Sequence, residues 1–100
     1  MSSLERLQAW YLSHCDDDWE HSYGIKILTL DNPGWMVEID LNETELEGCE
    51  FEKINIERSE NDWLVLKREE MKVRIACGPK NLEEVLAVFC DWAERTHDGE

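Results

Sequence analysis

The stretch "YGIKILTLDNPGWMVEIDL", residues 23–41, decides the fold. Apolar side chains recur at every second position on both sides of its centre, as they do in strands whose side chains point to opposite faces in turn. Between the two runs, "DNPG" (31–34) predicts a tight turn, in which Pro33 fixes one dihedral angle and Gly34 supplies a positive φ. The stretch therefore predicts a β-hairpin. The residues expected on one face of its second arm are Trp35, Val37, Ile39 and Leu41.

Three further strands are predicted downstream of this hairpin. Ile54 and Ile56 alternate with polar residues, and "SEND" (59–62) then turns the chain. The next strand spans 63–69, and we expect it at the centre of the sheet because its first residues are apolar on both faces. A fifth strand covers 71–77. The polar segment "NETELEGCE" (42–50) is expected to be a loop that leaves the edge of the sheet and returns.

A helix is predicted at each end of the chain. Ser2 and Glu5 form a capping box that starts the first helix, which should end between residues 13 and 15. Asn81 and Glu84 mark the start of the second helix, and the tail from residue 95 to 100 is expected to fray. The predicted fold is therefore α+β, a five-stranded, largely antiparallel meander sheet flanked by an N-terminal and a C-terminal helix (α-β5-α). Both helices are expected on one face, in a single domain covering residues 1–100.

Acidic residues dominate the charge of the chain. Ten Lys and Arg stand against 24 Asp and Glu, so the net charge is −14. Such a chain repels nucleic acid and anionic membranes and attracts basic partners through long-range steering. The N-terminus shows no signal peptide and no apolar run is long enough to span a membrane, so we expect a cytoplasmic protein with four reduced cysteines.

The stretch "HCDDDWEHSYG" (14–24) gathers the residue types that bind metals or perform catalysis. It fails as a calcium loop, because His21 and Ile27 stand where the EF-hand needs glycine and a bidentate acid. Zinc binding by Cys15 with His14 or His21 lacks a second ligand pair at a recognised spacing. The sequence therefore predicts neither a metal nor a cofactor.

Catalytic signatures are also lacking in the sequence. There is no nucleophile elbow, no glycine-rich phosphate loop and no zinc-protease motif. Cys90, followed five residues later by Arg95, lies in a strongly periodic helix instead of an anion-binding loop. We therefore predict a protein that is not an enzyme. Two alternatives stay open: a small hydrolase or sulfurtransferase that uses Cys15 or the acids of 16–20, and a generic acidic protein-interaction module.

Four segments between residues 4 and 93 carry a family resemblance: "LERLQAWYLSHCDDDWEHSYGIKILTLDNPGW" (4–35), "IDLNETELEG" (39–48), "IERSENDWLV" (56–65) and "GPKNLEEVLAVFCDWA" (78–93). Together they resemble the immunity protein 53 family of bacterial polymorphic toxin systems. The resemblance implies a protein that binds and silences a secreted or contact-delivered toxin in the producing cell. It implies no catalytic residues.

Acidity and resemblance together predict the partner and its binding patch. The partner expected is a basic toxin domain, for example a nuclease, captured by one copy of the chain. The chain itself is expected to be a monomer or a weak homodimer, because an open edge strand can pair two copies. Trp19 lies among the acids, either as a partner contact or as a plug at one end of the sheet. The predicted toxin-binding residues are Asp16, Asp17, Asp18, Trp19 and Glu20.

Overall fold

The capping box predicted at the N-terminus starts helix α1, Ser3–His14, in the computed structural model, which describes residues 1–98. The Ser2 hydroxyl accepts a hydrogen bond from the Glu5 N–H at 3.1 Å, and the Glu5 carboxylate accepts one from the Ser2 N–H at 2.9 Å. The helix ends within the predicted interval. It leaves the three consecutive aspartates outside, where they do not oppose the negative end of the helix dipole.

The predicted hairpin consists of β1, Ile25–Leu30, and β2, Gly34–Asp40. The two strands are antiparallel, with Ile25 opposite Ile39. The predicted role of Gly34 is wrong, because its φ is not positive. Glycine is needed there for space: a Cβ atom at this position would lie 2.4 Å from the carbonyl oxygen of Cys77.

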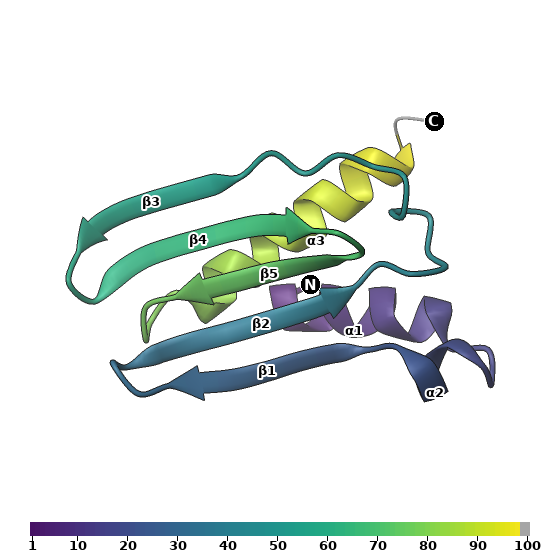
Figure 1. Ribbon diagram of the computed structural model, residues 1–100, viewed down its shortest axis with the longest axis horizontal. Coiled ribbons are helices and arrows are strands. Elements are labelled where there is room, and N and C mark those ends of the chain that lie inside the picture. The colour runs from purple at the N-terminus through teal and green to yellow at the C-terminus, as the bar shows by residue number, and fades with distance from the viewer. Residues whose placement is uncertain (99–100) are drawn as a thin grey trace.

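The sheet is antiparallel throughout, and its strand order corrects the predicted meander. The remaining strands are β3, Ile54–Ser59, β4, Asp62–Glu69, and β5, Lys72–Cys77. The order is β1-β2-β5-β4-β3, so β5 takes the central place expected for β4, and β3 forms the far edge (Figure 1). The connection 41–53 crosses one end of the sheet and leads the chain to the far edge, so that β3, β4 and β5 follow one another back toward β2.

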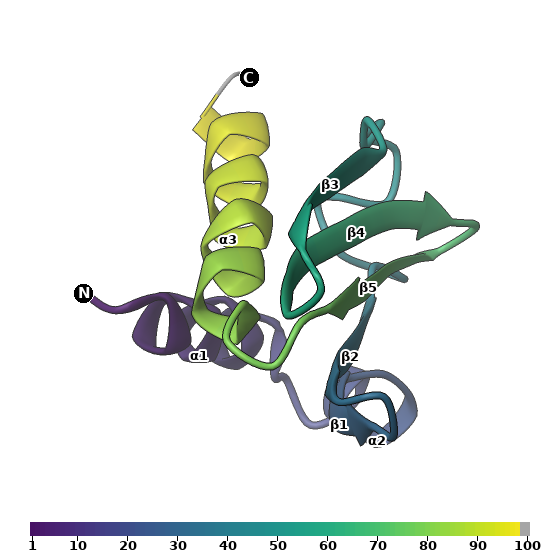
Figure 2. The same cartoon turned by 90° about the vertical axis from the view of Figure 1, so that its left-hand side faces the viewer.

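Both long helices cover the same face of the sheet, as predicted (Figure 2). Helix α3, Leu82–Asp98, buries Val85 and Phe89 completely against the sheet, and Leu7 brings α1 to the same core. The helix continues through the segment 95–98 that we expected to fray, whereas residues 99 and 100 lie outside the described part of the chain. Among the described residues, no helix is both long and apolar enough to cross a bilayer.

Candidate functional site

The predicted patch at residues 16–20 is a loop held by its own carboxylates. Asp16 accepts hydrogen bonds from the N–H groups of Asp18 and Trp19, at 3.0 and 2.9 Å. In return, the Glu20 carboxylate accepts from the N–H groups of Asp16 and Asp17, at 2.9 and 2.8 Å. Hydrogen bonds from the backbone N–H groups of Trp19 and Asp18 lower the pKa of Asp16 below its ordinary value. Backbone N–H groups also lower the pKa of Glu20, and the largest contribution comes from the N–H of Glu20 itself. The loop is therefore fixed by internal bonds before any partner binds.

Trp19 lies in the interior, which decides between the two readings of this residue. Trp19 is only 4% exposed, and it is the first residue of a one-turn helix, α2, Trp19–Ser22. The indole N–H donates to the carbonyl oxygen of Asn42 at 2.7 Å, and the ring packs edge-on against Trp10. Trp19 thus packs under the acidic loop, on its core side. In the free chain its side chain is not available on the surface to contact a partner.

Asp17 and Asp18 are the predicted site residues that face solvent without a partner. Both are exposed, and neither carboxylate makes a hydrogen bond or an ion pair with the described side chains, those of residues 1–96. Asp17 adopts a φ of 72°, a conformation that Asp and Asn tolerate better than most residues. This turn projects the two carboxylates from a loop whose other acids are already engaged.

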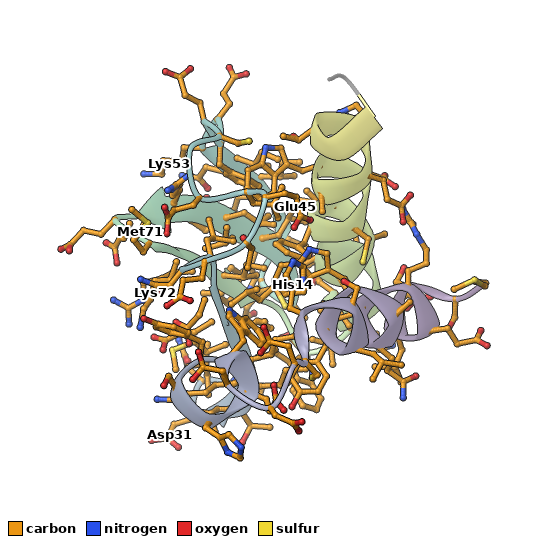
Figure 3. The ribbon with its side chains drawn as sticks, turned by 90° about the vertical axis from the view of Figure 1, so that its right-hand side faces the viewer. His14, Asp31, Glu45, Lys53, Met71 and Lys72 are labelled. Carbon is orange, nitrogen blue, oxygen red and sulfur yellow. The ribbon has the colours of Figure 1, made fainter. Side chains whose placement is uncertain are left out.

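A second loop, 41–53, packs beside the first. Its Glu45 accepts hydrogen bonds from His14 Nε2 at 2.6 Å and from the indole N–H of Trp10 at 3.3 Å (Figure 3). Burial is the largest single influence on Glu45 and opposes its ionisation. The hydrogen bonds from His14, the backbone and Trp10, together with the charge of His14, outweigh burial, so the pKa of this carboxyl stays below its ordinary value. Leu41 and Leu46 are fully buried, and they anchor the polar loop to the core.

Arg68, on β4, holds the second loop against the sheet by hydrogen bonds. Its guanidinium donates to the carbonyl oxygens of Leu46, Glu47 and Cys49, and its Nε donates to that of Glu70 at 2.8 Å. These partners are neutral carbonyl groups, so the charge of Arg68 orders the loop without being paired to any one of the nearby carboxylates.

The two loops and the β4–β5 turn together form one acidic end of the molecule. Figure 3 looks onto this end, with Glu45 and His14 at its centre and Met71 on the adjoining turn. The sequence analysis predicted 42–50 as a loop but placed only residues 16–20 in the candidate site, although the alternating glutamates of "NETELEG" were a signal for the second loop as well. The acidic residues of this end are Asp16, Asp17, Asp18, Glu20, Glu43, Glu45, Glu47, Glu50, Glu52 and Glu70.

Several of the basic side chains are paired with acids on other parts of the surface or at the border of this end. Arg74 bonds Glu38 at 2.7 Å on the sheet face that carries no helix. Arg6 joins the two long helices by bonding Asp91 at 2.7 Å. Further ion pairs are Arg58–Glu84 and Lys67–Glu69, and Lys72 bonds Asp40 beside the acidic end, where β5 begins and β2 ends. At the acidic end, Asp17 and Asp18 have no paired cation among residues 1–96, so part of the surplus of negative charge lies there.

The thiols and the metal-binding residue types form no evident reaction centre in the described chain. Burial raises the pKa of Cys77 and of Cys90 to about 11, far from the range of a reactive thiolate. The half-buried Cys15 donates its S–H to the carbonyl oxygen of Tyr11 at 3.4 Å. Among the side chains that the structure describes, those of residues 1–96, no three His, Cys, Asp or Glu residues converge as metal ligands would.

Comparison with known proteins identifies the family. The chain matches the family described as Immunity protein 53 over residues 4–94, which include both loops of the acidic end. No curated protein and no solved structure matches it. Because the match spans nearly the whole fold, from α1 to the later turns of α3, the chain belongs to the immunity protein 53 family.

Proposed function

We propose that this chain neutralises a bacterial toxin by binding its basic domain through the acidic end, in the cytoplasm of the cell that produces both proteins. Membership of an immunity-protein family supports a toxin as partner. The net charge of −14 supports a basic one. A nuclease domain fits this description because it must hold phosphates with cationic side chains, and carboxylates can take the places of those phosphates.

The observation that carries the proposal is the pair of free carboxylates on a loop that is already ordered. Asp17 and Asp18 project from a turn whose other acids, Asp16 and Glu20, are used to bond the loop backbone. A preorganised surface loses little conformational entropy when it binds. Its charge also speeds association with a cationic partner. We therefore expect tight capture by one copy per toxin, with no covalent change in either protein.

The enzymatic alternative would use Cys15 or the acids of 16–20. In the structure both carboxylate oxygens of Glu20 accept backbone N–H groups, and the Cys15 thiol donates to a carbonyl oxygen. These contacts favour structural roles for the two residues. A generic acidic interaction module is the other alternative, and it differs from an immunity protein in having no toxin encoded beside it.

A titration of toxin activity tests this proposal. The C-terminal toxin domain encoded next to this gene is mixed with increasing amounts of the protein at a concentration well above the dissociation constant. We expect activity to fall linearly and to vanish near a ratio of about one to one. The Cys15→Ser variant should neutralise at the same ratio. Neutralisation that continues with time at substoichiometric protein would establish an enzyme, and full toxin activity at excess protein would reject the proposal.

A further inference from the structure

The edge strand β1 exposes an apolar surface that nothing in the described chain covers. It forms one border of the sheet, opposite β3 (Figure 1). Four of its six residues are exposed, and among them Ile27 keeps 37% and Leu28 51% of its surface open to solvent. A long apolar edge strand of this kind is a template for pairing with another strand.

The backbone of β1 presents free hydrogen-bonding groups along this edge. The Asp40 N–H donates to the carbonyl oxygen of Gly24 at 3.0 Å, and this bond fixes the alternation of the β1–β2 ladder. Because bonded and non-bonded pairs alternate in an antiparallel ladder, Ile25, Ile27 and Thr29 direct their N–H and C=O groups outward. These groups can pair a second strand without disturbing the sheet.

The two edges of the sheet differ in charge. β3 carries Glu57 and Arg58, and Arg58 is further bonded to Glu84 at 2.6 Å. Charged side chains on an edge are a common protection against pairing. β1 carries one charge, Lys26, and no acid, although the chain as a whole has a net charge of −14. The β1 edge therefore lacks protecting acidic side chains, although the protein as a whole is strongly acidic.

We propose that β1 is a homodimer interface, at which two copies of this chain pair their β1 strands antiparallel around a twofold axis at Ile27. In this register Ile25 lies opposite Thr29 of the second copy, and about six backbone hydrogen bonds form between the outward groups. Lys26 falls opposite Leu28 of the second copy. No like charges are therefore opposed along the seam, and each lysine stem lies against an exposed leucine.

The groove between α1 and β1 also favours a second copy of the chain as the partner of this edge. It is lined by Leu7, Tyr11, Ile25 and Ile27, and Tyr11 is 38% exposed. The twofold axis keeps both sets of helices on one face of a continuous ten-stranded sheet. The two α1 helices then flank the seam, and the apolar side chains of the two grooves face each other across it.

A second copy fits this edge better than the basic toxin does. A cationic partner strand would place its charges beside Lys26, with no acid of β1 to pair them. The antiparallel pairing also sends the two acidic ends to opposite ends of the extended sheet, so each stays free. The dimer does not rest on the proposed toxin binding, because it uses another surface and requires no partner of another kind.

Sedimentation and light scattering across concentration and salt test this interface. The mass should rise from the 11.8 kDa of one chain toward twice that value between about 10 and about 500 μM protein. Added salt should strengthen the dimer, because it screens repulsion between two chains of net charge −14. A chain that stays monomeric over this whole range, at both low and high salt, would overturn the proposal.

Two isoleucine variants locate the seam. Ile27 and Ile56 have the same exposure, 37%, and lie on opposite edges of the sheet. We expect Ile27→Lys to raise the dimer dissociation constant at least about tenfold, because it places two lysines on the axis, whereas Ile56→Lys should leave it nearly unchanged. Equal weakening by both variants, or weakening by Ile56→Lys alone, would reject β1 as the interface.

Hydrogen exchange on the unmodified protein gives an answer even if Ile27→Lys fails to fold. The amides of Ile25, Ile27 and Thr29 point away from the sheet and should exchange fast in dilute protein. Their exchange should slow at high concentration, whereas the amides of Lys26 and Leu28, which face β2, should be protected at both. Exchange at the three outward amides that is independent of concentration while the mass doubles would place the interface elsewhere.

Discussion

At the scale of single residues, Trp19 links three separate parts of the chain. Its ring contacts Trp10 of α1, its backbone N–H bonds Asp16, and its indole N–H reaches Asn42 in loop 41–53. These contacts join the two loops of the acidic end through one buried side chain. The position of Asp17 and Asp18 therefore depends on a residue that does not itself meet solvent.

Replacing Trp19 by alanine should cost stability before it affects binding. The change removes a buried aromatic ring, so we expect the free energy of unfolding to fall by about 3–5 kcal/mol. Trp19→Phe keeps most of the apolar contact and loses the indole hydrogen bond, and it should cost about 1–3 kcal/mol. Urea unfolding followed by circular dichroism measures both. An unchanged unfolding midpoint for Trp19→Ala would contradict the buried position of this ring.

At the scale of elements, loop 41–53 is ordered by few residues. Leu41 and Leu46 bury its apolar side chains, and Arg68 supplies donors to three of its carbonyl groups. Arg68 comes from β4, on the sheet face that packs against the helices, where it stands opposite Val73. Arg68, whose neighbour across the sheet is apolar, thus determines how loop 41–53 is held at the acidic end.

Arg68→Lys should loosen this loop, because an ammonium group cannot place several donors in the fixed fork of a guanidinium. We expect a loss of roughly 1.5–3 kcal/mol in the free energy of unfolding. Amide exchange in residues 46–50 should accelerate, and this is measured by NMR. Arg74→Lys is the matched control, since Arg74 pairs with the carboxylates of Glu38 and Glu69 on the other sheet face, and a lysine ammonium can also pair with a carboxylate. An equal effect of the two variants would show that the fork does not hold the loop.

Short-range sequence patterns predicted most of the helices and strands. They did not predict which strands, distant in the sequence, would pair with each other. The capping box of Ser2, the alternation in β2 and the cap at Asn81 are properties of neighbouring residues, and the structure confirms the elements they predicted. The insertion of β5 between β2 and β4 depends on which strands bury the most apolar surface together, and nothing in "NETELEG" records where its loop crosses. The burial of Trp19 was equally undetermined, because its acidic neighbours point outward while its ring points inward.

At the scale of the whole molecule, the central claim is that negative charge acts from one end. The variant pair Asp17→Asn/Asp18→Asn and the pair Glu57→Gln/Glu60→Gln each remove two charges and leave the same net charge. Asn also tolerates the positive φ of residue 17. The first pair lies on the acidic end, and the second lies near the β3–β4 turn at the opposite end of the sheet (Figure 1). Only the location of the charge differs between them.

The rate of association with the neighbouring toxin domain, measured by stopped flow against ionic strength, tests this claim most directly. For the unmodified protein we expect a fall of at least about tenfold between about 20 and about 500 mM NaCl. Asp17→Asn/Asp18→Asn should slow association several-fold at low salt and not at high salt, whereas Glu57→Gln/Glu60→Gln should stay close to the unmodified rate. A rate that does not change with salt, or equal slowing by the two variants, would contradict capture through the acidic end.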